Sequence, residues 1–373
     1  MPTTQKDIAQ RLQLSRSLVA GVLGAQPGVF ASPETRQRVL EAAREMNYRP
    51  HAAARALRSG KTMVVSLAFL PDEREEAPER SSGGWDSLVE TLARCLSERD
   101  YKLQVELFAS RAKALAGLEE LARSRSCDAV VLFGAERVAQ TSVAPLVEAG
   151  VPFVLKGYFE EHATWPQIDF DHGAMMHAAV AHLRALGHER IAFLGVDNDE
   201  VYARRLRVGF EAAMHELAPR VASTALRARV AVQNDTLATL RRWLALGEDT
   251  RPTAVVIGTN AYATWVECEV ALAEVGLQVG EGAGEFALCG LHPPQLPLLF
   301  GRAHGFDQAD FDHLAQVLCE ELLLPTLEGH APASPVVRVL PPMRPLPSLE
   351  LGRHNVFLPH SLEGAAPQPD ALA

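Results

Sequence analysis

Residues 4–23 read TQKDIAQRLQLSRSLVAGVL, and this stretch decides how the chain begins to fold. Thr4 and Asp7 have the spacing of a capping box, in which each side chain bonds the backbone amide of the other. A helix should therefore start directly after Thr4. Its buried face should consist of Ile8, Ala9 and Leu12.

Two further helix starts follow. Ser15, after the short break at 13–14, has the position of an N-cap for a helix over residues 16–23. At residues 32–34, Ser-Pro-Glu combines an N-cap, a proline at the first helical position and an acid in the first turn, which predicts a helix to about Asn47. The buried face of this third helix should consist of Val39, Leu40, Ala43 and Met46. Three short helices with a tight turn between the first two describe a helix-turn-helix.

The second helix of such a head lies in the DNA major groove, with its N-terminal residues against the base edges. Arg16 and Ser17, with Ala20 one turn further on, occupy the outward positions. Arginine at this place suits a pair of hydrogen bonds to guanine. The alternative is that Arg16 contacts only phosphate, as many protein–DNA hydrogen bonds do.

Charge is distributed unevenly along the chain. Residues 1–61 carry ten Lys or Arg and four Asp or Glu, whereas the remaining residues carry 26 and 42. The net charge of the whole chain is −10, which would argue against a nucleic-acid partner if it were spread evenly. A basic head on an acidic body instead fits a chain whose head alone meets phosphates.

Residues 4–9 and 14–23, with Thr-Arg-Gln-Arg-Val at 35–39 and Asn-Tyr-Arg-Pro at 47–50, give the head a resemblance to the lactose-repressor/purine-repressor (LacI/GalR-type) family. The resemblance implies a dimer that binds double-stranded operator DNA. It implies DNA contacts from Thr4, Ser15, Arg16, Ser17, Ala20, Tyr48, His51, Ala54 and Arg55. Relatives carry a turn glycine at Gln13 and often an arginine at Gly21, so base preference cannot be copied from them.

The hinge at residues 51–59 is short and Ala-rich, hence marginal as an isolated helix in water. In the family that it resembles, this segment folds on the operator and two copies place a leucine in the minor groove. Leu57 matches that leucine. An apolar wedge between base steps kinks DNA, and the additional contacts offset the cost of unstacking. The alternative is that Leu57 is an ordinary linker residue.

From Met63 onward, short β-rich runs alternate with amphipathic segments. Strands are expected at 64–69, 102–107, 129–133, 152–155, 190–194, 254–257 and 286–288. Helices are expected at 87–97, 111–124, 174–186, 204–217, 236–246 and 265–275. Alternating βα units predict doubly wound parallel sheets, and two such halves would form a cleft that takes a ligand at the carboxyl ends of the strands.

Residues 186–195 (LGHERIAFLG), 251–256 (RPTAVV) and 339–342 (VLPP) are similar to the two-lobed, periplasmic-binding-protein-like core of the same family. The resemblance implies an effector pocket lined by Trp85, Asp169, Arg205, Asn260, His292 and Gln308. Trp85 would stack on the ligand, and the polar side chains would hold it.

Several pocket positions depart from the family pattern. Gly157 replaces a common Asp, His292 and Pro293 replace an acidic pair, and Phe170 replaces an Asn. Sugar hydroxyls need several fixed acceptors, so the lost carboxylates argue against a standard sugar site. Either the effector is sugar-like but atypical, aromatic or anionic, with Arg205 as anion partner, or the pocket is vestigial.

Other classes of protein find little support. A polar N-terminus without a signal peptide and the lack of a long apolar window predict a cytoplasmic protein with no membrane partner. Five scattered cysteines fit reduced thiols. His172, His177 and His182 recur every five residues, which spreads them around a helix, so neither a metal site nor a cofactor is expected. No catalytic motif predicts an enzyme, and a solute-binding protein would need a signal peptide.

The predicted organisation is α/β. It comprises a helix-turn-helix domain at 1–49, a hinge helix at 50–61, a two-lobed effector-binding and dimerisation core at 62–350 and a poorly ordered tail at 351–373. The predicted function is that of a sequence-specific regulator, a repressor, which binds a pseudo-palindromic operator as a homodimer and responds to a small molecule between the lobes. The alternative is a constitutive DNA-binding regulator whose core serves only for dimerisation.

Overall fold

The computed structural model describes residues 3–24, 30–48, 60–71, 85–134, 139–195, 201–218, 235–259, 262–282, 284–291, 303–306 and 309–345. The chain divides into two compact units. The first comprises Met1–Val64 with Ser126–Asp128, and the second comprises Val65–Arg125 with Ala129–Ala373.

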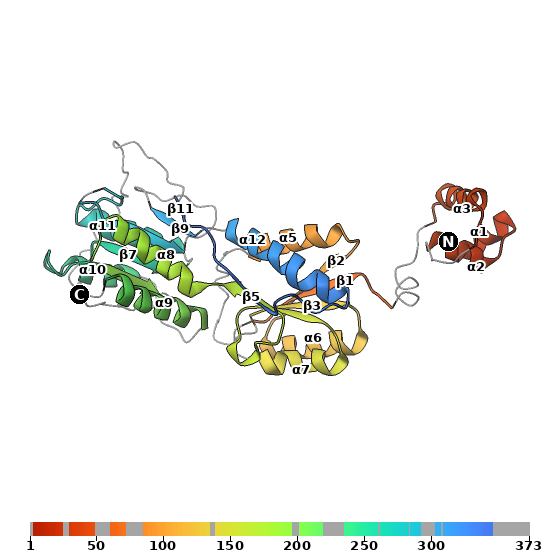
Figure 1. The fold of residues 1–373 in the computed structure, drawn as a ribbon, viewed down its shortest axis with the longest axis horizontal. Helices are drawn as coiled ribbons and strands as arrows, with labels where there is room; N and C mark the ends of the chain where they lie inside the picture. Colours follow the sequence, from red (N-terminus) through yellow and green to blue (C-terminus); the bar gives the residue numbers. More distant parts are fainter. Residues whose placement is uncertain are drawn as a thin grey trace, which may run out of the picture. The chain divides into compact units, whose positions relative to one another are not determined.

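The first unit contains the predicted three-helix head (Figure 1). Its helices are α1 (Gln5–Leu12), α2 (Arg16–Leu23) and α3 (Pro33–Glu45). All three predicted N-caps form. The Thr4 amide donates to Asp7 Oδ2 at 2.8 Å in a complete capping box. Ser15 Oγ accepts from the Leu18 amide at 3.2 Å, and Ser32 Oγ accepts from the Thr35 amide at 3.1 Å. These local bonds fix where each helix begins.

The head has its own small hydrophobic core. The buried members are Ile8, Ala9, Val19, Val22, Val39, Ala42 and Ala43. The prediction that Leu40 is buried was wrong, since its side chain is 39% exposed and Ala42 is buried in its place. Val39, Ala42 and Ala43 lie on one helical face, and a residue one position after Val39 is turned away from it by about 100°.

The second unit begins with a six-stranded sheet of order β10-β5-β4-β3-β1-β2. Its strands are β1 (Val64–Phe69), β2 (Lys102–Leu107), β3 (Ala129–Phe133), β4 (Phe153–Lys156), β5 (Gln167–Phe170) and β10 (Val336–Val339). The pairs β1–β3, β3–β4, β4–β5 and β5–β10 are parallel. The order from β2 to β5 is that of a doubly wound sheet. In Figure 1, α5 (Trp85–Ser97) and α12 (Ala309–Val317) cover one face, and α6 (Arg111–Ser124) and α7 (Ala139–Ala149) cover the other.

A second, five-stranded sheet has the order β11-β9-β8-β7-β6. Its strands are β6 (Ile191–Gly195), β7 (Ala254–Gly258), β8 (Ala287–Leu291), β9 (His304–Phe306) and β11 (Arg344–Pro345), and only the β11–β9 pair in this sheet is antiparallel among the described residues. Ala192 and Leu194 pack in one core with α10 (Asp235–Leu244) and α11 (Tyr262–Glu274). Phe193 stacks instead on Phe210 of α9 (Val201–Leu217), which packs against α8 (His172–Ala185). Helices therefore cover both faces of this sheet.

Several helices and strands of the structure were not predicted from the sequence. They are β5, β9, β10, β11, α7, α12, the short helices η1 (Glu160–His162) and α13 (Leu324–Leu327), and the π-helix η2 (Leu318–Leu323). β5 was missed because buried Gln167 and Asp169 interrupt its apolar pattern, and α7 because it contains Pro145. Within the described part of the chain, no helix has the length and apolarity needed to span a membrane.

Candidate DNA-binding head and core polar cluster

Helix α2 presents its first residues to solvent. Val19 and Val22 of α2 are buried in the head, whereas Arg16 and Ser17 are exposed and Ala20 is half-buried. Ser15 caps the helix, and its Oγ also lies 3.2 Å from Ser17 Oγ. Two buried valines thus fix the rotation of α2, so that Arg16 and Ser17 are free to meet a partner.

The other predicted head residues have structural partners. Thr4 Oγ1 donates to Asp7 Oδ2 at 2.7 Å, and hydrogen bonds from the Thr4 backbone and side chain lower the pKa of Asp7. Tyr48 packs partly buried against the head core, and its amide donates to the Ala43 carbonyl at 2.8 Å. The hinge residues His51, Ala54, Arg55 and Leu57 lie outside the described residues.

In the core, a buried carboxylate and an ammonium group meet at the carboxyl ends of two neighbouring parallel strands. Lys156 ends β4, and Asp169 is the third residue of β5. Lys156 Nζ lies 3.1 Å from Asp169 Oδ1, and the two side chains are 13% and 3% exposed. Phe170 donates its amide to the same oxygen at 2.9 Å. Burial would raise the pKa of Asp169, but Lys156 above all, with His172 and the Phe170 amide, lowers it. The carboxylate is therefore charged.

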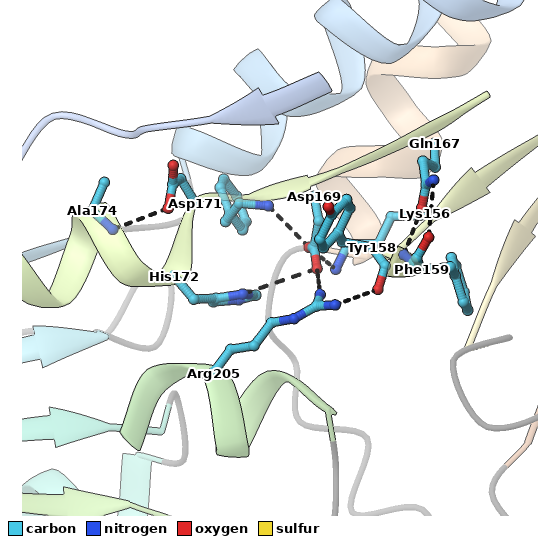
Figure 2. Close-up of polar contacts among 10 residues, drawn as sticks. Lys156, Tyr158, Phe159, Gln167, Asp169, Asp171, His172, Ala174 and Arg205 are labelled. Atoms are coloured by element: carbon cyan, nitrogen blue, oxygen red, sulfur yellow. Dashed lines mark hydrogen bonds and ion pairs between the residues drawn. The ribbon is translucent and has the colours of Figure 1, made fainter. Parts of the chain in front are cut away.

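Arg205 reaches this carboxylate from the other half of the second unit. It projects from α9, which follows the five-stranded sheet, and its Nη1 lies 3.9 Å from Asp169 Oδ2. Figure 2 shows the same guanidinium donating to the Tyr158 carbonyl, at 2.6 Å. The Tyr158 ring lies 4.5 Å from the Arg205 guanidinium and 4.1 Å from that of Arg338 on β10. One side chain of α9 thus joins the ends of β4 and β5.

His172 adds a titratable group to this polar cluster, which we define as Lys156, Asp169, His172 and Arg205. It is the first residue of α8, and its Nδ1 lies 4.0 Å from Asp169 Oδ2 without a hydrogen bond to any described residue. Burial lowers the pKa of His172, which outweighs the opposite effect of Asp169. The imidazole is therefore neutral near pH 7.

A close helix crossing sets the position of Arg205. A Cβ built on Gly209, one turn after Arg205 in α9, would lie 2.9 Å from the Gly173 Cα and 3.3 Å from the His172 carbonyl oxygen. Only glycine at this position lets α9 approach the first turn of α8 so closely. This contact between α8 and α9 places both Arg205 and His172 beside Asp169 Oδ2.

Two of the departures from the family pattern have physical reasons. Gly157, after β4, has φ of 130°, a backbone conformation that a residue with a side chain adopts only under strain, so an aspartate does not fit there without rearrangement. Phe170 packs edge-on against Phe311 of α12 with ring centroids 4.9 Å apart, which makes it part of the packing between β5 and α12.

The structure brings together two of the predicted effector residues, Asp169 and Arg205. Trp85 is the first residue of α5, but its side chain is not described, and Asn260, His292 and Gln308 lie outside the described residues. The sequence reasoning missed Lys156, Tyr158 and His172 as members or neighbours of the site. A lysine directly after the predicted strand 152–155 is the signal that would have identified Lys156, because strand ends of a parallel sheet meet at one edge.

The comparisons with known proteins agree with this architecture. The periplasmic binding protein-like domain family matches residues 180–290. The HTH-type transcriptional regulator RafR of Escherichia coli is 32% identical over 216 residues, which span 57% of this chain and 60% of the length of RafR. The HTH-type transcriptional regulator AglR of Rhizobium meliloti (strain 1021) is 28% identical over 300 residues, or 80% of each chain.

The chain is therefore similar to HTH-type transcriptional regulators, and a solved regulatory protein of the LacI family from Chloroflexus aggregans shares its fold, with a TM-score of 0.61 and 20% identity over 75% of this chain and 96% of that one. The lac repressor dimer bound to operator and the anti-inducer ONPF has the same fold, with a TM-score of 0.68 and 20% identity over 93% of this chain and 98% of that one. The predicted fold class is thus confirmed. Its named relatives are transcriptional regulators, as expected for a protein that is not an enzyme.

Proposed function

We propose that this chain is a regulator of the LacI family, which binds a pseudo-palindromic operator as a homodimer and acts as a repressor in the cytoplasm. The observation that carries the proposal is the capped helix α2, which buries Val19 and Val22 and exposes Arg16 and Ser17. The excess of basic residues over residues 1–61 supports contact with phosphates. A single head reads one half-site, so a two-fold operator calls for a dimer.

Deletion of residues 1–61 tests this proposal. The full chain should retain a small set of duplexes from a random pool, and the truncated chain should retain none while remaining folded and dimeric by light scattering. Because the deletion ends at residue 61, it also tests the proposed boundary between the hinge at 50–61 and the core that begins at residue 62. Sequence-specific binding by the truncated chain would contradict the proposal.

We further propose that a small-molecule effector binds beside the polar cluster, with Trp85, Asn260, His292 and Gln308 as further contacts. Asp169 Oδ1 already accepts hydrogen bonds from Lys156 and the Phe170 amide, which reduces its capacity to accept from sugar hydroxyls. The Arg205 side chain is 20% exposed and suits an anionic group. Because Arg205 joins β4 and β5 to α9, a ligand there would favour one arrangement of the two halves over another.

A thermal-shift screen with neutral sugars, nucleosides and sugar phosphates tests this second proposal. An anionic ligand that binds the folded protein should raise its melting temperature, and Trp85→Phe should reduce the accompanying change in fluorescence. Arg205→Gln should abolish the shift. Operator release by a neutral hexose, unaffected by either substitution, would contradict the site. If no compound binds, the alternative of a constitutive regulator with a core for dimerisation only is favoured.

A further inference from the structure

Two histidines and a glutamate converge in the five-stranded half of the second unit, away from the polar cluster. His182 lies on α8, His304 on β9, and Glu281 in the loop between Val279 and Phe286. One nitrogen or oxygen atom from each of the three side chains lies within 4.8 Å of the other two. Sequence spacing along α8 could not reveal this group, since its members are separated by long stretches of chain.

The distances suit a shared ion. His182 Nε2 lies 3.9 Å from Glu281 Oε1, His304 Nδ1 contacts the same oxygen directly, and the two imidazole centroids are 4.5 Å apart. Ligand atoms about 2.0–2.1 Å from a tetrahedral zinc ion lie about 3.3–3.5 Å from one another. Small rotations of the three side chains would bring their ligand atoms to that spacing.

Glu281 Oε1 and His304 Nδ1 are both shielded from solvent and lie against each other, and neither makes a hydrogen bond that meets normal geometry with a described residue. Buried polar atoms usually have such hydrogen bonds, and a cation between these two atoms would be a partner for both.

The loop that carries Glu281 is held by other groups. Glu285 accepts the Gly282 amide at 2.6 Å, and the Gly280 amide donates to the Phe286 carbonyl at 3.1 Å. The Glu281 side chain takes part in neither hydrogen bond. The loop therefore positions this carboxylate and leaves its oxygens available to a ligand. His304 is fixed in turn by the parallel pairing of β9 with β8.

We propose that His182, Glu281 and His304 form a binding site for a divalent transition-metal ion, of which zinc is the best representative. Zinc accepts two imidazoles and one carboxylate, whereas magnesium and calcium prefer oxygen ligands alone and disfavour the two imidazoles. Three protein ligands leave a further position for water or another small ligand. The ion would connect α8, the loop and β9, so it should stabilise this half of the second unit. The proposal does not depend on DNA or effector binding.

Zinc titration of the full-length protein tests the proposal. The protein is first treated with a chelator, which is then removed, and zinc is added in competition with a chromophoric chelator. We expect one equivalent per chain and a rise in melting temperature. His182→Gln, Glu281→Gln and His304→Gln should each weaken zinc binding by at least about 10-fold and abolish the rise in melting temperature. His177→Gln is the matched control on α8, since His177 is 45% exposed and lies against Glu216 instead, and it should bind zinc as the parent does.

Cobalt substitution distinguishes this site from the cysteines. The near-ultraviolet spectrum of the cobalt protein should lack a thiolate charge-transfer band, and its visible ligand-field bands should disappear in the three ligand variants. Circular dichroism of the metal-free variants establishes that they fold, and the use of three variants keeps the test valid if one does not. Binding that survives all three substitutions, that is lost equally in His177→Gln, or that shows thiolate ligation would overturn the proposal.

Discussion

The head and the polar cluster differ in how their functional side chains are held, because those of the head are exposed and those of the cluster are buried. In the head, Arg16 and Ser17 are exposed on a helix that buried valines hold from behind. In the core, Asp169 is 3% exposed and surrounded by groups from β4, α8 and α9. Substitutions of Arg16 and Ser17 should therefore alter binding with little effect on stability, whereas substitutions in the core cluster should alter both.

The largest expected effect is that of Asp169→Asn. Loss of the buried carboxylate leaves Lys156, which is 13% exposed, without its charge partner. Removing one member of a buried ion pair should lower the free energy of unfolding by about 3 kcal/mol. Urea unfolding of the variant and of the parent protein measures this change in the free energy of unfolding. Arg207→Gln, which breaks a half-exposed pair with Glu211 on the same helix α9, is the control and should cost less than about 0.5 kcal/mol. Equal effects of the two substitutions would remove the distinction between buried and exposed sites.

Arg16→Ala should act on recognition alone. We expect it to cost about 1–3 kcal/mol at one base position in each half-site and to relax the preference there, because a bidentate contact to guanine is lost. Binding to a panel of single-base operator variants measures this change, and urea unfolding should be unaltered. A uniform loss across all sequences, with a weaker dependence on salt, would instead identify Arg16 as a phosphate contact.

Gly209→Ala tests how the cluster is positioned. The added methyl group would lie 2.9 Å from the Gly173 Cα, so α8 and α9 must separate slightly. We expect a loss of about 1–3 kcal/mol in the free energy of unfolding, as for other overpacked sites. Val208→Ala, at an exposed position of the same helix, should have almost no effect. If Gly209→Ala is as mild as this control, close packing does not position Arg205.

The buried histidine of the cluster predicts a pH dependence. Because burial lowers the pKa of folded His172, the unfolded chain binds a proton near pH 6.5 that the folded chain does not. Stability is thus full above this pH and falls with acidification, by about 1 kcal/mol between about pH 7 and pH 5.5. His172→Gln should reduce this slope, and the remainder should come from His182 and His188, whose pKa values are also lowered by burial. Urea unfolding at each pH measures it, and an unchanged slope would contradict a buried, neutral His172.

The smallest expected effect is in the head. Gln13, in the turn between α1 and α2, has φ of 56°, a conformation that glycine adopts more readily. Gln13→Gly should stabilise the head by about 0.5–1 kcal/mol, after allowance for the greater freedom of glycine in the unfolded chain. Hydrogen exchange of the α1 amides measures the change. Faster exchange in the variant would show that the glutamine side chain contributes more than the strained backbone costs.

These two regions also differed in how far the sequence could predict them. The head was predicted almost completely, because Thr4, Ser15 and Ser32 are caps whose partners lie three residues away. The cluster was predicted only through Asp169 and Arg205. Lys156 and His172 join it through the pairing of β4 with β5 and through the crossing of α8 and α9, and neither contact is encoded in local spacing. The same is true of the His182, Glu281 and His304 group.

Selection of binding sites from a random pool of duplexes by the full-length protein tests the central claim most directly, namely that exposed residues of α2 in a dimer read DNA. The proposal predicts an enriched motif of two inverted half-sites, and Arg16→Ala should lose preference at one base of each half-site, symmetrically, while Asp169→Asn that remains folded should keep it. An unenriched pool, a motif without two-fold symmetry, or a base preference that changes with Asp169 and not with Arg16 would contradict it.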